Sequence, residues 1–175
     1  MIKIVYITGC LGFMGSYITR TCLEKGWYVK GVDKMTYAAN NDLLKEFKKY
    51  PNFSFVKCDI NDLEFLYECD YIINTAAETH VDRSIESSDE FIQTNVNGTH
   101  TLLKLMHDFP IKKFIQISTD EVYGTLTEDD DPFTENTPLA PNSPYAASKT
   151  SADLLCRSFY ETYKYPIVIT RCSNN

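Results

Sequence analysis

Two hydroxyls and two adjacent carboxyls in the middle of the chain have the side-chain types needed for acid–base chemistry. They are Ser118, Thr119, Asp120 and Glu121, and they directly follow residues 114–117, an apolar run with the composition of a buried parallel strand. In an open α/β sheet, ligands bind beyond the carboxyl ends of the strands. Adjacent carboxyls in a partly dry cleft tend to have their pKa values pushed apart, so one would serve as an acid and the other as a base. An isolated run of this kind is more often a polar turn, and its meaning depends on the motifs around it.

Three glycines near the N-terminus predict a turn that binds phosphate. Gly9, Gly12 and Gly15 follow an apolar run, residues 2–7, and open a helix that we expect over residues 16–24. Glycine lets the backbone turn tightly and approach a pyrophosphate, which then lies at the N-terminus of the helix. A glycine triplet alone is a weak signal, but its place between a strand and a helix indicates a dinucleotide site.

Acids at the ends of the next two expected strands indicate which dinucleotide binds. Asp33 ends the strand over residues 28–33, where a carboxylate accepts hydrogen bonds from both hydroxyls of an adenosine ribose and repels a 2′-phosphate. This favours NAD over NADP. Asp59 and Ile60 follow the strand over residues 53–57 and could hold an adenine, although a turn or cap is an equally good interpretation of Asp59.

Tyr145 and Lys149 are a second pair with chemical capacity. Ser143 has the character of a helix N-cap and Pro144 that of a first helical residue, so the pair lies on one face of a helix that we expect to reach about residue 163. A free tyrosine is a poor base at neutral pH because its pKa is ~10. A lysine ammonium one turn away and the positive nicotinamide ring of NAD⁺ would both favour the phenolate. We therefore expect Tyr145 to be the base that takes a proton from an alcohol.

The remaining segments complete a doubly wound parallel α/β sheet, a Rossmann fold. Further strands are expected over residues 71–74, 114–119 and 166–170. Between them, a helix should begin at a capping box formed by Ser87 and Glu90 and end before Pro110. Residues 125–142 are expected to form an acidic, solvated loop.

Composition limits the function classes. The chain of 175 residues has the size of one domain, with 43% hydrophobic and 23% charged residues, as in soluble globular proteins. A net charge of −7 argues against nucleic acid or an anionic membrane as a partner. No apolar run approaches the ~20 residues of a membrane span, and the N-terminal run is too short for a signal peptide. The six cysteines are dispersed and the three histidines lack ligand spacing, so we expect free thiols, no metal site and a cytoplasmic location.

Taken together, these motifs resemble those of the extended short-chain dehydrogenase/reductase superfamily. More narrowly, the chain resembles the nucleoside-diphosphate-glucose 4,6-dehydratases, above all those of the dTDP-glucose type. The matching segments are residues 33–38 (DKMTYA), 76–84 (AAETHVDRS), 118–124 (STDEVYG), 144–149 (PYAASK) and 171–175 (RCSNN). The adjacent Asp120 and Glu121 are the most specific element, because epimerases and decarboxylases of the superfamily usually lack that pair.

The resemblance implies an enzyme, an NAD-dependent lyase of nucleotide-sugar metabolism such as rhamnose biosynthesis, acting on dTDP-glucose or UDP-glucose. Tyr145, supported by Lys149 and Thr119, would deprotonate the 4-hydroxyl of the glucose while a hydride passes to NAD⁺. Glu121 would then remove the C5 proton and Asp120 would protonate the departing 6-hydroxyl. The hydride would return to C6 and give the 4-keto-6-deoxy sugar.

The resemblance also implies a set of binding residues. The adenosine and pyrophosphate of NAD would meet Gly9, Gly12, Phe13, Met14, Gly15, Asp33, Lys34, Met35, Thr36, Asp59 and Ile60. The nicotinamide half would meet Ala76, Ala77, Thr79, Thr94, Tyr145, Lys149 and Asn175. The nucleotide-sugar substrate would meet Thr79, Thr119 and Asn174, although the division of roles between the two asparagines stays open.

Three residues and the length depart from the pattern of the relatives. Cys10 and Leu11 stand where small residues are usual, so we expect more bulk beside the pyrophosphate, and Ala39 stands where glycine is usual. Relatives continue past Asn175 into a smaller domain that holds the nucleotide of the substrate. We therefore expect residues 1–175 to be a catalytic Rossmann domain without the substrate domain, inactive by itself and homodimeric in full-length form.

Two alternatives stay open at this point. One is a binding module that holds NAD and turns nothing over. The other is a sugar-nucleotide 4-epimerase of the same superfamily, against which the adjacent Asp120 and Glu121 argue.

Overall fold

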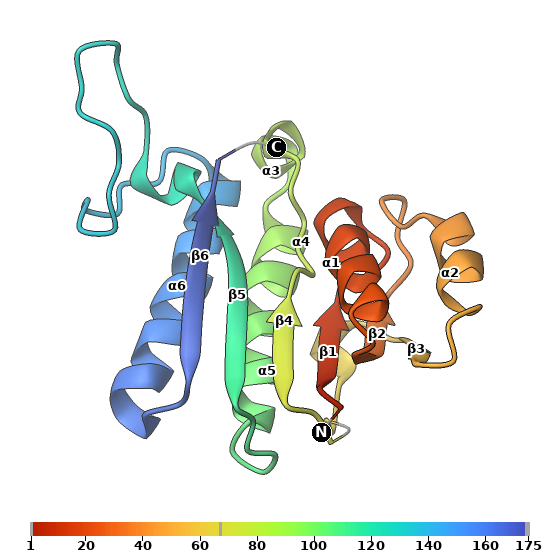
Figure 1. Ribbon diagram of the computed structural model, residues 1–175. Coiled ribbons are helices and arrows are strands. Elements are labelled where there is room, and N and C mark those ends of the chain that lie inside the picture. Colours follow the sequence, from red (N-terminus) through yellow and green to blue (C-terminus); the bar gives the residue numbers. More distant parts are fainter. Residues whose placement is uncertain (1, 67, 174–175) are drawn as a thin grey trace.

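The computed structural model describes residues 2–66 and 68–173. Within them, a parallel sheet of six strands has the order β3-β2-β1-β4-β5-β6 (Figure 1). The strands are β1 (Ile4–Thr8), β2 (Tyr28–Asp33), β3 (Phe53–Lys57), β4 (Tyr71–Asn74), β5 (Lys113–Thr119) and β6 (Ile167–Cys172). The chain order reverses between β1 and β4, which is the switch point of a doubly wound fold. The predicted doubly wound parallel α/β sheet is confirmed.

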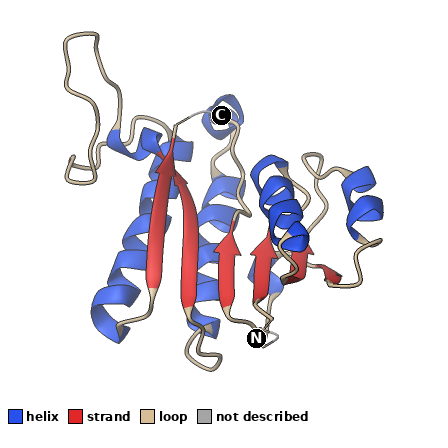
Figure 2. Cartoon of the chain, in the orientation of Figure 1, coloured by secondary structure: helices blue, strands red, loops and turns tan. Residues whose placement is uncertain are grey.

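Helices cover both faces of this sheet (Figure 2). One face carries α1 and α2, and the other carries α4, α5 and α6. The bounds are α1 (Phe13–Glu24), α2 (Asn41–Phe47), α3 (Val81–Glu86), α4 (Asp89–Phe91), the π-helical η2 (Ile92–Asn97), α5 (Gly98–Leu105) and α6 (Pro144–Tyr163), with 3₁₀ turns η1 (Ile60–Asp62) and η3 (Asp120–Tyr123). None of these helices has both the length and the apolar character that crossing a membrane requires.

Alternation of side chains along the strands produces two hydrophobic cores. On β1, Val5 and Ile7 pack with residues of α1 and α2, whereas Tyr6 packs with residues of α5 and α6. All three side chains are fully buried, and burial of one such apolar side chain stabilises the fold by about 1.5–3 kcal/mol. Because both faces are covered, β1 is an uninterrupted apolar run with no polar face.

The helix that follows β4 differs from its prediction. Ser87 is the C-cap residue of α3, and the next helix begins at Asp89 after Ser88, whose side chain makes no capping hydrogen bond. The capping-box prediction is therefore wrong, because the backbone of Ser87 belongs to the preceding helix. The chain then passes through the π-helical η2 before α5 ends at Leu105, five residues before Pro110.

The start of α6 agrees with its prediction. The backbone N–H of Ala146 donates a hydrogen bond to Ser143 Oγ at 3.0 Å, and Pro144 is the first helical residue. The helix runs to Tyr163, and Lys164 leaves it with a left-handed φ of 57°. All six cysteines are free thiols in this structure.

Candidate active site

Two neighbouring cavities lie at the carboxyl edge of the sheet. The first, here the β2 cavity, is lined by the predicted residues Gly9, Gly12, Asp33, Lys34, Thr36, Asp59, Ile60, Ala76, Ala77 and Thr94. The second, here the β5 cavity, is lined by the predicted residues Gly9, Gly12, Phe13, Met14, Gly15, Ala77, Thr79, Thr119, Tyr145 and Lys149. Because Gly9, Gly12 and Ala77 line both cavities, the glycine turn joins them. An elongated ligand could therefore extend from one to the other across the turn.

The glycines of this turn have different reasons to be glycine. Gly9 has a φ of +64°, and a Cβ there would lie 2.8 Å from backbone atoms of Ala76. A Cβ on Gly15 would collide with the carbonyl oxygen of Gly9 and lie 2.7 Å from Thr75 Oγ1. A Cβ on Gly12 would meet only the Gly9 oxygen, at 3.4 Å. The fold therefore requires glycine at positions 9 and 15, whereas Gly12 leaves space at the junction of the cavities.

Cys10 and Leu11 do not add bulk to this junction. Their side chains are 0% and 1% exposed and belong to the core beneath α1 and α2. The expectation of a crowded pyrophosphate turn is therefore wrong. The physical reason is that the backbone of the turn points both side chains inward, where their size fills the core. Ala39 packs against the same core.

Asp33 holds two turns together. One oxygen of its buried carboxylate accepts a hydrogen bond from Leu11 N at 3.0 Å, and the other accepts from Met35 N at 2.7 Å. A carboxylate has about four acceptor sites, so capacity remains on the cavity side. Met35 has a left-handed φ of 61° and packs against the core, and it lines neither cavity. A role for Met35 in binding the ribose stays a prediction.

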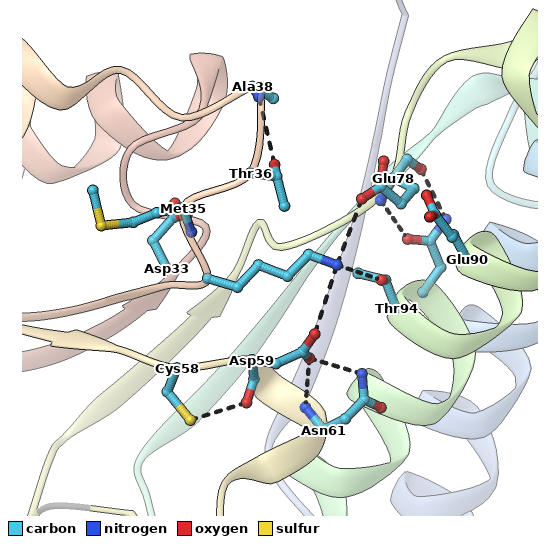
Figure 3. Close-up of polar contacts among 12 residues, drawn as sticks. Asp33, Met35, Thr36, Ala38, Cys58, Asp59, Asn61, Glu78, Glu90 and Thr94 are labelled. Atoms are coloured by element: carbon cyan, nitrogen blue, oxygen red, sulfur yellow. Dashed lines mark hydrogen bonds and ion pairs between the residues drawn. The ribbon is translucent and has the colours of Figure 1, made fainter.

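Lys34 lines the β2 cavity and contacts three polar side chains there. These side chains, Asp59, Glu78 and Thr94, are labelled in Figure 3. Its ammonium lies 3.6 Å from a carboxylate oxygen of Asp59 and 3.6 Å from one of Glu78, and it donates a hydrogen bond to Thr94 Oγ1 at 3.2 Å. Asp59 also accepts from Asn61 N at 2.9 Å, so it both caps η1 and lines the cavity. The positive charge of Lys34 thus compensates the negative charges of two carboxylates, one after β3 and one after β4.

Glu78 is a cavity residue that the sequence analysis missed. It is 6% exposed, and Oε2 accepts a hydrogen bond from the Tyr37 hydroxyl at 3.4 Å. Its backbone N–H and carbonyl both bond to the side chain of Asn95, at 2.9 Å each. A signal was present, since Glu78 lies inside the segment 76–84 that carried the family resemblance. An acid next to two alanines after a strand gave no reason by itself to expect a buried position.

Thr119, Tyr145 and Lys149 converge on the β5 cavity. Burial raises the pKa of Tyr145 to about 12, the charge of Glu121 adds to the rise, and a hydrogen bond with Thr119 opposes it. In the protein without a ligand, the surroundings of Tyr145 therefore favour the neutral phenol, whereas we expected them to favour the phenolate. The ammonium of Lys149 donates a hydrogen bond to the Ile117 carbonyl at 2.6 Å. Burial lowers the pKa of Lys149 to about 8, and the charge of Asp153 opposes that change.

Asp120 and Glu121 form the 3₁₀ turn η3 immediately after β5. The Thr119 hydroxyl caps this turn, because Oγ1 accepts a hydrogen bond from Glu121 N at 3.2 Å. Burial raises the pKa of Glu121, and the neighbouring Asp120 charge raises it further. Asp120 lines an adjoining cavity, which shares Ser173 with the β5 cavity. The two acids therefore flank the cavity that holds Tyr145 and do not line it.

Asn174 and Asn175 lie outside the described residues. Among residues 2–66 and 68–173, no group of three or more His, Cys, Asp or Glu side chains is placed to hold a metal ion.

The fold and the joined cavities define a dinucleotide-binding α/β protein of the short-chain dehydrogenase/reductase type. The chain belongs to the GDP-mannose 4,6-dehydratase family, whose model matches residues 6–175.

Similar proteins include two curated relatives. The low-salt glycan biosynthesis protein Agl12 of Haloferax volcanii is 47% identical and is matched over 98% of this chain and 56% of its own. A dTDP-glucose 4,6-dehydratase of Xanthomonas campestris is 43% identical, over 97% of this chain and 52% of its own. The chain therefore spans about half the length of the curated relatives it matches.

Solved structures give the same picture. The dTDP-glucose 4,6-dehydratase DesIV of Streptomyces venezuelae, with NAD bound, superposes with a TM-score of 0.90 at 41% identity, over 97% of this chain and 55% of that one. A UDP-glucuronic acid 4-epimerase of Bacillus cereus, with NAD bound, has a TM-score of 0.89 at 27% identity, over 96% and 55% of the two chains. The fold is thus common to both activities, and the sequence is nearer to the dehydratases.

Proposed function

We propose that this protein takes part in the NAD-dependent 4,6-dehydration of a nucleotide-activated glucose, dTDP-glucose or UDP-glucose, to its 4-keto-6-deoxy sugar. The observation that carries the proposal is the convergence of Thr119, Tyr145 and Lys149 on a cavity that opens onto the glycine turn, with Asp120 and Glu121 directly beside it. The names of the dehydratase relatives support it.

NAD fits the residues that line the two cavities. The absent side chain of Gly12 leaves space where they join, and α1 starts at the next residue, so its N-terminal N–H groups can bind a pyrophosphate. Asp33 retains acceptor capacity for the adenosine ribose, and the β2 cavity also carries Asp59 and Ile60 for the adenine. When bound, NAD⁺ supplies an acceptor for a hydride and later gives the hydride back. Residues of the β5 cavity would surround the nicotinamide.

Tyr145 is the residue that takes the proton from the 4-hydroxyl. Because burial disfavours its phenolate, Tyr145 needs positive charge nearby before it can act as a base. Lys149 supplies such charge from the same cavity, and a bound nicotinamide cation adds to it. Thr119 lines the same cavity, and its hydroxyl lowers the pKa of the phenol.

Glu121 and Asp120 carry out the elimination. The raised pKa of Glu121 makes its carboxylate a stronger base for the C5 proton. Asp120, from the adjoining cavity, protonates the departing 6-hydroxyl. Both acids lie on η3, immediately after β5, which supports assigning them to one step.

The 4-epimerase is the weaker candidate. Epimerisation needs no acid–base pair for elimination, and the epimerase structure is less similar in sequence than the dehydratase structure, 27% against 41% identity. A non-catalytic NAD-binding module gives no chemical role to Asp120, Glu121 and Tyr145. We further propose that residues 1–175 are the NAD-binding and catalytic domain.

We also propose a homodimer and a cytoplasmic location. Leu154, Tyr160 and Tyr163 of α6 expose apolar surface that a second copy could cover. Free thiols suit a reducing compartment. Light scattering of the purified protein would decide the first point.

The test of the proposed function has two parts. The first is calorimetric titration with NAD⁺ and NADP⁺. The second is incubation with NAD⁺ and either dTDP-glucose or UDP-glucose, followed by the alkali-induced ultraviolet absorbance of 4-keto-6-deoxy sugars. It is made on a protein of the relatives' full length, because residues 1–175 are expected to be inactive by themselves. Binding of NAD⁺ with formation of this chromophore supports the dehydratase. Conversion of the glucose nucleotide to its galactose isomer would establish the epimerase in its place.

A further inference from the structure

Behind the candidate catalytic residues lies a buried ion pair between Asp153 of α6 and Arg171 of β6. Asp153 is 1% exposed, and its Oδ2 accepts a hydrogen bond from Arg171 Nε at 2.9 Å. Burial raises the pKa of Asp153, and the hydrogen bond and positive charge of Arg171 oppose that rise. Neither residue was singled out by the spacing of the motifs.

The other end of the guanidinium reaches the turn that carries the two acids. Arg171 Nη1 donates a hydrogen bond to the Tyr123 hydroxyl at 2.7 Å, and the guanidinium carbon lies 4.9 Å from the centre of that ring. Tyr123 is the last residue of η3, three positions after Asp120. The planar guanidinium offers several donors at fixed angles, so one side chain can hold both partners.

Asp153 connects the pair to the remaining elements. It lies one helical turn after Lys149, and each of these charges favours the ionised form of the other. The Ser118 hydroxyl approaches the carboxylate from β5 without reaching good hydrogen-bond geometry. The groups around the Lys149 ammonium are thus Tyr145, Asp153 and Cys156 of α6, the Ile117 carbonyl of β5 and, through Asp153, Arg171 of β6.

We propose that Asp153 and Arg171 are positioning residues that fix η3, with Asp120 and Glu121, relative to α6, with Tyr145 and Lys149. The inference rests on the proposed function for its meaning, because the groups positioned are those assigned to catalysis there. β5 and α6 are separated by the loop 124–143, and Figure 1 shows this loop extending away from the sheet. Covalent continuity therefore cannot set the distance between η3 and α6, and contacts across the fold must do so.

The test compares two variants that remove different parts of the network. Tyr123→Phe deletes only the hydroxyl and keeps the ring against Phe133, with centroids 5.1 Å apart. Asp153→Asn removes the charge and keeps the shape. The control is Glu161→Gln, which makes the same kind of change in an exposed ion pair with Lys164 on the same helix.

Two readouts on the 175-residue chain separate positioning from general stability. One is the exchange rate of the Gly124 amide, which donates to the Glu121 carbonyl in η3, against that of the Ser16 amide in α1. The other is the pH midpoint of Lys149 from ¹³C-lysine NMR, assigned with Lys149→Arg. Tyr123→Phe should speed exchange at Gly124 roughly tenfold and leave Ser16 and the Lys149 midpoint unchanged. Asp153→Asn should lower the Lys149 midpoint by about one pH unit.

NAD⁺ titration of the same samples keeps the two proposals distinguishable. If the unmutated chain fails to bind NAD⁺, the proposed function is wrong. The exchange and NMR data still test the positioning role of Asp153 and Arg171 in that case. If NAD⁺ binds but both variants match Glu161→Gln in Gly124 exchange and Lys149 midpoint, the positioning role is overturned. Equal acceleration of exchange at Gly124 and Ser16 also overturns it, because that result indicates general destabilisation.

Discussion

The ammonium nitrogen of Lys149 lies 2.6 Å from the carbonyl oxygen of Ile117, to which it donates a hydrogen bond. This contact ties the first turns of α6 to the last residues of β5, so the lysine is a structural link between the two elements as well as a charge beside Tyr145. Lys149 as a whole is 4% exposed, so it has little contact with water. The pH dependence of stability should therefore report on it.

Lys149→Met is expected to change how stability depends on pH. Burial lowers the pKa of Lys149 from 10.5 to about 8. Between these values the unfolded chain holds a proton that the folded chain has released, so the Lys149 contribution to the free energy of unfolding rises with pH. The variant lacks this contribution. Urea unfolding gives the free energy of unfolding of both proteins at each pH. The value for the variant minus the value for the unmutated protein should be greatest near pH 8 and should fall toward pH 10. A constant difference would contradict the buried ionisation.

Gly12→Ala and Gly15→Ala should separate binding from folding. A Cβ on Gly15 would strike the Gly9 carbonyl oxygen, so that variant should lose roughly 1–3 kcal/mol of stability. A Cβ on Gly12 has space in the protein alone and would occupy the junction of the cavities. Gly12→Ala should keep its thermal midpoint and lose NAD affinity by calorimetry. Unchanged affinity in a folded Gly12→Ala variant would show that no ligand crosses this junction.

Asp33→Ala is expected to weaken NAD binding by roughly 1–3 kcal/mol, through lost hydrogen bonds of a charged group. It should also lower stability, because the Leu11 and Met35 amides lose their acceptor. Asp42→Ala, in an exposed ion pair with Lys45, is the matched control and should leave NAD affinity unchanged. Tighter binding of NADP than NAD to the unmutated protein would show that Asp33 does not select the cofactor.

Glu121→Gln and Asp120→Asn should stop the reaction after oxidation at C4, because each removes a group needed for elimination. Reduced NAD should then accumulate in the presence of the glucose nucleotide. Tyr145→Phe should prevent accumulation, since no base remains for the 4-hydroxyl. The measurement is absorbance of reduced NAD in an active preparation with dTDP-glucose or UDP-glucose. Accumulation in Tyr145→Phe at the unmutated rate would end the proposed role of Tyr145.

Much of the fold followed from local patterns. The bounds of β2, β3 and β4 agree with the predicted ones because short apolar runs between turn residues mark buried strands. Ser143 and Pro144 marked the start of α6 because capping depends on residues adjacent in the chain. The capping box at Ser87 failed for a related reason: the same local pattern occurs where another helix is ending.

The sequence by itself determined most of the residues that could do chemistry, and the strand end or helix start at which each would lie. Only the tertiary structure decided which of them meet. It turned Cys10 and Leu11 into the core, placed Lys34 between Asp59 and Glu78, and joined Asp153 to Tyr123 through Arg171. The reason is physical: propensity and spacing act between near neighbours in the chain, whereas contacts between charged groups depend on strand order and packing. Sequence spacing carries no direct record of either.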